Sequence, residues 1–95
     1  MSRLRFSRRA ELDLVDIGAW IAADRPFAAR KMVNRLIERA SALREHPEMG
    51  ALYPVYGADI RALAVRPYLV LYRVSGEHVF IERVVHSARL PKHIA

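Results

Sequence analysis

The chain of 95 residues contains no cysteine and no long apolar run. Without cysteine it can form neither a disulfide bond nor a thiolate metal site. No apolar stretch approaches the roughly 18 residues that a membrane span requires, and residues 1–6 lack the apolar run of a signal peptide. Linkers, internal repeats and low-complexity segments are also missing. These absences predict one domain over residues 1–95, in the cytoplasm and without a membrane partner.

The sequence also lacks a recognisable catalytic or metal-binding motif. Its four histidines, at positions 46, 78, 86 and 93, have no spacing typical of a metal site. No serine lies in the context of a nucleophile elbow. A domain of this size can build one compact core but no deep cofactor cavity. We therefore expect neither a metal nor a cofactor.

Positive charge is abundant and unevenly distributed. Sixteen Lys and Arg against ten Asp and Glu give a net charge of +6. Residues 1–9 carry +4 and residues 60–95 carry +4, whereas residues 10–59 carry −2. If the two ends meet in one sheet, they form one basic surface, which favours an anionic partner such as nucleic acid or an acidic peptide. A charge that serves only solubility gives the same totals.

Two helices are indicated by the spacing of apolar residues in the first half of the chain. Ser7 can accept a free backbone N–H of the following turn, so it marks the start of a helix over Arg8–Ala23. Pro26 fits the first turn of a second helix, over Pro26–Glu45. The short connection predicts an antiparallel helical hairpin. The outward positions of the second helix are basic: Arg30, Lys31, Arg35, Arg39 and Arg44.

Strand patterns lie on both sides of this hairpin. Residues 3–7 alternate polar and apolar, which predicts a short strand. Residues 52–58 are predicted to form a loop. The tail over residues 87–95 is predicted to be loosely held. Three strands are predicted in the second half, joined in part by a tight turn at residues 75–77: Ile60–Val65, Tyr68–Ser75 and His78–His86. The fold class is therefore α+β in the order β-α-α-β-β-β, with the hairpin on one face of an antiparallel sheet. We expect the first strand to join that sheet.

This ordered set of elements resembles the ParE/RelE superfamily of toxins, and more closely its ParE branch. The resemblance covers about residues 3–89. It is carried by Ser7-Arg8-Arg9-Ala10 followed by Asp13-Leu14 and Ile17, by Pro26 with Ala28-Ala29, by Leu43 and then His46-Pro47-Glu48-Met49-Gly50, by Arg61-Ala62-Leu63-Ala64-Val65, by Tyr68-Leu69-Val70-Leu71-Tyr72-Arg73-Val74, and by Ile81-Glu82-Arg83-Val84-Val85-His86-Ser87-Ala88-Arg89. It implies a toxin of a type II toxin–antitoxin module that forms a hetero-oligomer with its cognate ParD-like antitoxin. In this family, the antitoxin's acidic C-terminal segment folds onto the toxin.

The resemblance leaves two targets open. The ParE branch is associated with inhibition of DNA gyrase, and the RelE branch with ribosome-dependent cleavage of mRNA. RelE-type toxins place an arginine after the tyrosine that opens the second of the three strands, and here Leu69 follows Tyr68. They also tend to carry a tyrosine toward the C-terminus, which residues 87–95 lack. We therefore predict a gyrase inhibitor without catalytic residues, and keep the RelE-like endonuclease as the alternative.

A third hypothesis is a nucleic-acid-binding domain without toxicity. A helix-turn-helix, an aromatic platform for base stacking and a glycine-rich loop are the sequence features typical of that class. None of them is evident in this sequence. The hypothesis is therefore less favoured than either toxin.

Two groups of residues are candidates for binding. The candidates for contact with the target are Arg61, Arg73, Arg83, His86 and Arg89. The candidates for contact with the antitoxin are Arg3, Arg5, Arg66, Tyr68 and Trp20. The strand arginines can also be plain solvated residues, and Trp20 can be an edge of the core. Arg83 lies in an apolar strand, so an ion pair with Glu82 or with a helix acid is the favoured interpretation for it.

Overall fold

A computed structural model describes residues 3–89 of the chain. These described residues form two α-helices, five strands and three short 3-10 helices (η). Their bounds are β1 Arg3–Phe6, α1 Arg8–Ala22, α2 Pro26–Ser41, η1 Ala42–Arg44, β2 Ala51–Leu52, η2 Pro54–Tyr56, β3 Arg61–Val65, β4 Tyr68–Ser75, β5 His78–His86 and η3 Ser87–Arg89. Both predicted helices and all four predicted strands are present.

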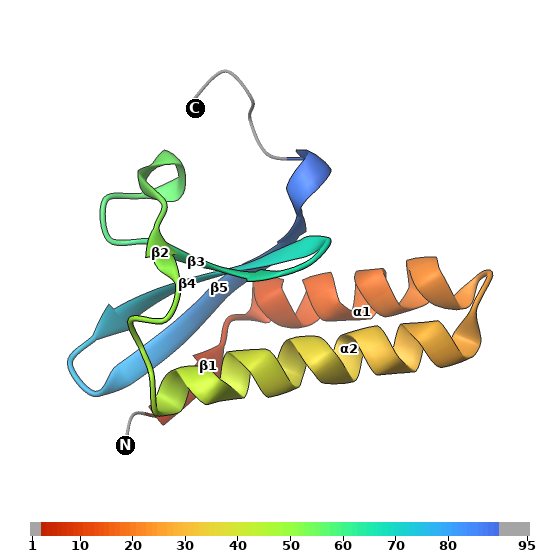
Figure 1. Cartoon of the computed structure of the whole chain (residues 1–95), viewed down its shortest axis with the longest axis horizontal. Helices are drawn as coiled ribbons and strands as arrows, with labels where there is room; N and C mark the ends of the chain where they lie inside the picture. Colours follow the sequence, from red (N-terminus) through yellow and green to blue (C-terminus); the bar gives the residue numbers. More distant parts are fainter. Residues whose placement is uncertain (1–2, 90–95) are drawn as a thin grey trace.

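The elements form two layers, with the α1–α2 hairpin on one face of a five-stranded sheet (Figure 1). The strand order is β1-β5-β4-β3-β2. The predicted α+β fold is therefore confirmed, and the sheet is antiparallel except at one edge, where β1 runs parallel to β5. A tight turn forces its two strands to be antiparallel. No such turn joins β1 to β5, so their relative direction is free of this constraint.

The first strand, the first helix and the strand after the loop each differ from the sequence prediction by one residue, and three other regions differ by more. The predicted loop over residues 52–58 contains η2, and its first residue, Leu52, belongs to β2, whose two residues pair with β3. Two residues are too few to show the alternation that identifies a strand in a sequence. The second helix ends at Ser41, and its last turn tightens into η1. The tail prediction falls partly on η3, and residues 90–95 lie outside the described residues.

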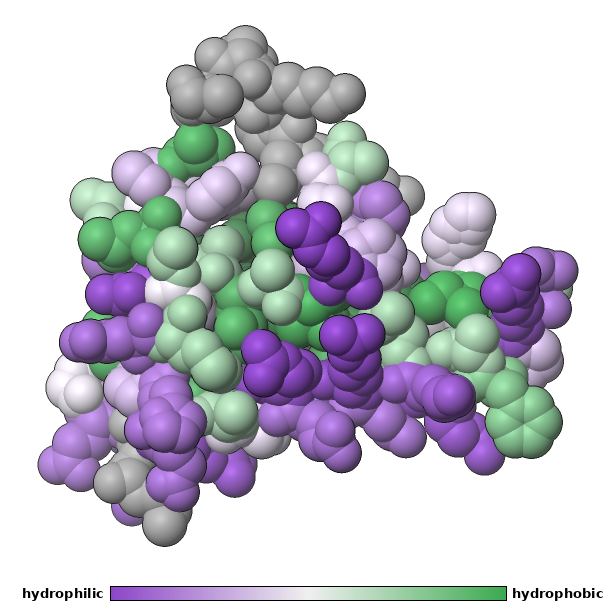
Figure 2. Space-filling view, in the orientation of Figure 1, coloured by the Kyte–Doolittle hydropathy of each residue, from purple (hydrophilic) through white to green (hydrophobic). Residues whose placement is uncertain are grey.

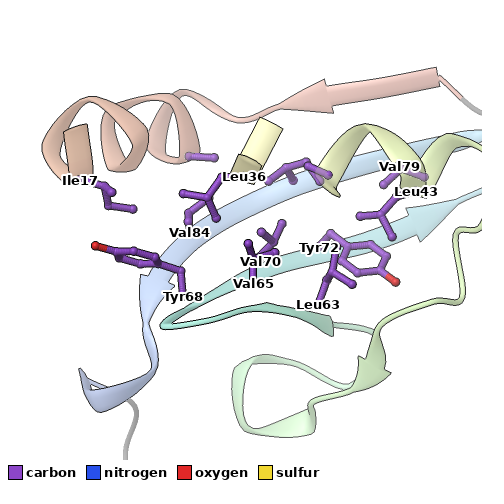
Figure 3. Close-up of a cluster of buried hydrophobic side chains, with 13 residues drawn as sticks. Ile17, Leu36, Leu43, Leu63, Val65, Tyr68, Val70, Tyr72, Val79 and Val84 are labelled. Atoms are coloured by element: carbon purple, nitrogen blue, oxygen red, sulfur yellow. The ribbon is translucent and has the colours of Figure 1, made fainter. Parts of the chain in front are cut away.

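Much of the outward side of α2 is hydrophilic (Figure 2), although Phe27 near its start is exposed. All five predicted basic positions on this side of the chain are exposed: Arg30, Lys31, Arg35, Arg39 and Arg44. The opposite side of the hairpin is buried against the sheet. Leu36 and Leu43 lie between the helical layer and the inner face of the sheet, above Val70 and Tyr72 (Figure 3). Burial of such side chains supplies the main favourable free energy of the fold.

The buried Tyr72 hydroxyl anchors the turn at residues 46–50 to the sheet. It donates a hydrogen bond to the carbonyl oxygen of Pro47 (2.7 Å) and accepts one from the backbone N–H of Gly50 (2.8 Å). Arg61 donates to the Gly50 carbonyl oxygen at 2.7 Å. A Cβ atom at position 50 would lie 2.8 Å from the Tyr72 ring and from the Ala62 carbonyl oxygen, so only glycine fits. The His-Pro-x-x-Gly segment therefore has a structural role.

Replacement of Tyr72 by Phe should destabilise the fold. The change removes both hydrogen bonds and leaves a buried N–H and a carbonyl oxygen without their partner, so we expect the free energy of unfolding to fall by about 1–3 kcal/mol. Urea denaturation measures this difference. Tyr53→Phe is the control, because the Tyr53 hydroxyl has no hydrogen-bond partner within residues 3–89. Equal midpoints for the two variants would contradict the assignment.

Tyr72 should also make stability depend on alkaline pH. Burial raises the pKa of Tyr72, and the hydrogen bond from Gly50 lowers it by less. A raised pKa means that the folded state holds the proton more tightly than the unfolded state. The contribution of the Tyr72 hydroxyl to the free energy of unfolding is full below a pH of about 10, the pKa of an unfolded tyrosine. It is lost as the pH rises through the pKa of Tyr72 in the folded state. Urea denaturation at a series of alkaline pH values should show the wild-type advantage over Tyr72→Phe shrinking.

Candidate functional site

The start of α1 closes the edge of the sheet at the point where β1 ends. Phe6, the last residue of β1, is level with Ile81, so β5 continues beyond its neighbour. The Ser7 backbone N–H donates to the Ile81 carbonyl oxygen at 2.9 Å, and its hydroxyl donates to the Glu82 carbonyl oxygen at 2.8 Å. The same hydroxyl accepts the Ala10 N–H at 2.9 Å, which makes Ser7 the N-cap of α1, as predicted.

Asp13, further along α1, also binds the free edge of β5. Its Oδ2 atom accepts the Val84 backbone N–H at 2.9 Å and Arg83 Nε at 2.8 Å, and its Oδ1 atom accepts a second Arg83 nitrogen at 3.2 Å. The predicted ion pair between Arg83 and a helix acid is thus present. The hydrogen bond to Asp13 is the main cause that raises the pKa of Arg83. Glu82 pairs instead with Arg73, at 2.7 Å.

A cavity of about 390 Å³ opens beside this ion pair, between α1, η2 and the end of β5. Its walls combine aromatic, acidic and imidazole side chains, from Trp20, Tyr56, Tyr68, Asp16 and His86. The side chain of Tyr68 lies under Ile17 at this end of the core (Figure 3). The His86 ring meets Tyr68 edge-on, with centroids 5.3 Å apart, and its Nδ1 accepts the Ala88 N–H at 3.1 Å. This cavity suits an aromatic or apolar group that also carries charge.

The outer face of the sheet carries a second cluster, where the two basic ends of the chain meet. Arg5 is level with Phe80 on β5, and Phe80 is level with Arg73 on β4. The Arg73 guanidinium lies 4.4 Å from the centre of the Phe80 ring while it pairs with Glu82. The pairing of β1 with β5 confirms that residues from both basic ends share one sheet.

The structure regroups the predicted binding residues. Four of them line the cavity, two from each predicted group: Arg83 and His86, and Trp20 and Tyr68. Two further target candidates have partners elsewhere: Arg61 binds the Gly50 carbonyl oxygen, and Arg73 binds Glu82. Of the others, Arg3 and Arg5 lie on β1, Arg66 lies in the β3–β4 turn and Arg89 lies in η3. β1 pairs with the start of β5, so its two arginines lie far from the cavity at the end of β5.

Two acidic residues of the cavity did not emerge as candidates from the sequence alone. In the sequence, Asp13 and Asp16 are simply acidic residues near the start of a helix, where the helix dipole favours negative charge. A signal for Asp13 does exist, because it lies three residues after Ala10 and four before Ile17, on the buried side of α1. An acid at such a position needs a buried partner. Asp16 carries no comparable signal.

The described residues contain neither a metal-ligand cluster nor a membrane-spanning helix. Within residues 3–89, no three His, Asp or Glu side chains gather as metal ligands would. Neither α1 nor α2 is long and apolar enough to cross a membrane.

Comparisons with known proteins place these features in a family. Residues 4–91 match the family model described as the ParE toxin of type II toxin–antitoxin systems. The chain is 38% identical over 91 residues to Toxin RelE2 of Caulobacter vibrioides, covering 95% of this chain and all of the relative. It is 36% identical over 85 residues to the putative toxin Y4kP of Sinorhizobium fredii, covering 90% of this chain and 88% of the relative.

Solved structures share the fold. A chain of the chromosomal ParDE toxin–antitoxin system from P. aeruginosa superposes with a TM-score of 0.79 at 28% identity, covering 90% of this chain and 96% of the other. A chain of the RelBE2 toxin–antitoxin complex from Mycobacterium tuberculosis superposes with a TM-score of 0.67 at 22% identity, covering 90% of each. The second likeness concerns the fold alone.

Asp13→Asn should destabilise the protein, whereas Asp16→Asn should not. The asparagine can still accept the Val84 N–H, but Arg83 loses its carboxylate partner. Because Arg83 is partly exposed to water, we expect a loss of about 1–3 kcal/mol of unfolding free energy. Urea denaturation of both variants measures the loss. Asp16 is the matched control, as it lies on the same helix and is exposed. A similar loss in both variants would rule out a specific role for the Asp13–Arg83 pair.

Proposed function

The chain belongs to the ParE toxin family of type II toxin–antitoxin systems, and from this premise we propose that it inhibits DNA gyrase and is neutralised by a ParD-like antitoxin. Its general role is that of the toxin in such a module. The proposal concerns the target and the way in which each partner is bound.

The observation that carries the proposal is the state of the strand arginines. Cleavage of RNA requires a base, an acid and a cation that can reach the reacting phosphate. Arg73 is paired with Glu82, and Arg83 with Asp13. Arg61 is hydrogen-bonded to a backbone carbonyl. With these cations held by internal partners, the sheet is better suited to binding a protein than to cutting a phosphodiester.

The antitoxin contact is proposed at the predicted residues Trp20, Tyr68, Arg66, Arg3 and Arg5. Trp20 is 63% exposed and can receive an apolar side chain in the cavity, while the arginines attract an acidic segment. Arg3 is level with His78 at the start of β5, and His86 lines the cavity at its other end, roughly 26 Å away at about 3.3 Å per residue. A segment that contacts all five residues therefore runs the length of β5.

The gyrase contact is proposed at the end of β5 and its outer face. His86 lies in the cavity wall and Arg89 follows in η3. Arg61, Arg73 and Arg83 keep their internal partners and offer their remaining N–H groups. Because Arg83 and His86 share the cavity with Trp20 and Tyr68, a bound antitoxin blocks this end of the target surface. This overlap supplies a direct route to neutralisation.

Induced expression in bacteria, with and without the product of the adjacent gene, tests the target. DNA synthesis should fall before translation, and the neighbour should restore growth. Purified toxin should inhibit supercoiling by purified gyrase. A fall in translation first, with discrete cuts in mRNA, would refute the gyrase proposal and leave the family assignment intact.

A RelE-like endonuclease is the second candidate, and one observation favours it. His86 lines the same cavity as Asp16, so an imidazole and a carboxylate face one space. Such a pair can serve as acid and base in RNA cleavage. For a nuclease, Asp16→Asn and His86→Gln should each abolish mRNA cutting while the protein stays folded. For a gyrase inhibitor, the wild-type protein itself produces no cuts.

A further inference from the structure

The side of α1 that points away from the sheet is apolar, unlike the hydrophilic outer side of α2. Its positions Leu12, Val15, Ala19 and Ala22 recur at spacings of three, four and three, which places them on one face of the helix. Leu12 is 44% exposed and Val15 is 64% exposed. Both alanines are also exposed. A solvated helix normally carries polar residues on this face.

Ile37 extends this apolar face onto α2. The two helices are antiparallel and in contact at Gly18, where an added Cβ would lie 3.4 Å from Val33. This contact sets their register, so Val15 on α1 lies nearly level with Ile37, one turn beyond Val33. Ile37 is 40% exposed. We call Leu12, Val15, Ala19, Ala22 and Ile37 the outer stripe.

We propose that the outer stripe is the contact between two copies of this chain, with their α1 helices antiparallel about a two-fold axis near residue 17. In this arrangement Leu12 of one copy is opposite Ala22 of the other, and Val15 is opposite Ala19. Each large side chain therefore meets a small one, which allows the two helices to approach closely and interdigitate. A parallel arrangement would instead set Leu12 against Leu12 and leave the alanines facing each other.

The charges at the two ends of the stripe favour the same arrangement. Arg8 and Glu11 lie at one end, whereas Asp24 and Arg30 lie at the other, and all four are exposed. Antiparallel packing brings Arg8 toward Asp24 of the second copy, and Glu11 toward Arg30. Parallel packing would instead bring each of these residues toward the same residue of the second copy, so like charges would face each other. The stripe is thus complementary to itself in size and in charge, as an isologous contact requires.

The size of the stripe limits the strength of this contact. α1 has 15 residues and is about 22 Å long, so the buried area is near or below the about 1,200 Å² at the low end of stable interfaces. The dimer should therefore be weak, with a dissociation constant in the micromolar range or above. It also leaves the cavity accessible, because α1 presents Asp13 and Ile17 to the sheet and the outer stripe to solvent.

Sedimentation equilibrium of the full chain over a range of micromolar concentrations tests the proposal, with Val15→Lys as the variant. We expect the wild-type mass to rise toward that of a dimer, and Val15→Lys to weaken association about tenfold or more. Leu52→Lys is the matched control, because Leu52 is 57% exposed on β2, outside the stripe, and should dimerise like the wild type. Urea denaturation verifies that both variants fold.

A charge exchange tests the orientation. Arg8→Asp and Asp24→Arg should each weaken the dimer, and the double variant should recover it. A monomer at all concentrations would overturn the proposal, as would a dimer that Val15→Lys leaves intact. If the free toxin is monomeric and Val15→Lys reduces antitoxin binding, the stripe belongs to the antitoxin and the second copy is excluded. None of these outcomes depends on the identity of the target.

Discussion

One buried carboxylate joins the two layers of this protein at the edge of β5 that β1 leaves open. Asp13 reaches from α1 to β5, 70 residues further along the chain, and there satisfies a strand N–H and a guanidinium at once. An unpaired strand edge is open to unwanted pairing, and a buried acid without partners is costly. The Asp13 carboxylate accepts the free Val84 N–H of the strand edge, and this N–H together with Arg83 gives the carboxylate its partners. The same contact fixes the wall of the cavity, because Arg83 and Val84 line it together with Asp13.

The length of β1 divides the edge of β5 into two parts. β1 stops at Phe6 while β5 continues to His86, so one end of β5 is covered by a strand and the other by a helix. Strand pairing leaves little room beside the covered part. The helix stands further from the strand, and the cavity fills part of this space. A toxin that must bind a target and an antitoxin can use such a space for both.

Local patterns predict most of the fold and less of the site. Apolar spacing and the N-cap at Ser7 are properties of neighbouring residues, so the helices, the strands and the hairpin turn could be predicted from the sequence. The parallel pairing of β1, the two-residue β2 and the Asp13–Arg83 pair are contacts between distant residues. Local patterns can mark Asp13 and Arg83 as residues that need a partner, but they do not identify the partner in any of these contacts. The cavity could not be predicted for the same reason, although Trp20, Tyr68, Arg83 and His86 were each candidates.

The bulge in β5 directs two adjacent side chains to different partners. Leu71 is level with Arg83 and Tyr72 with Ile81, so Glu82 has no opposite residue on β4. Glu82 and Arg83, adjacent in sequence, therefore join different networks, one with Arg73 on the outer face and one with Asp13 on α1. A substitution at Glu82 therefore removes the partner of Arg73 and leaves both members of the Asp13–Arg83 pair in place.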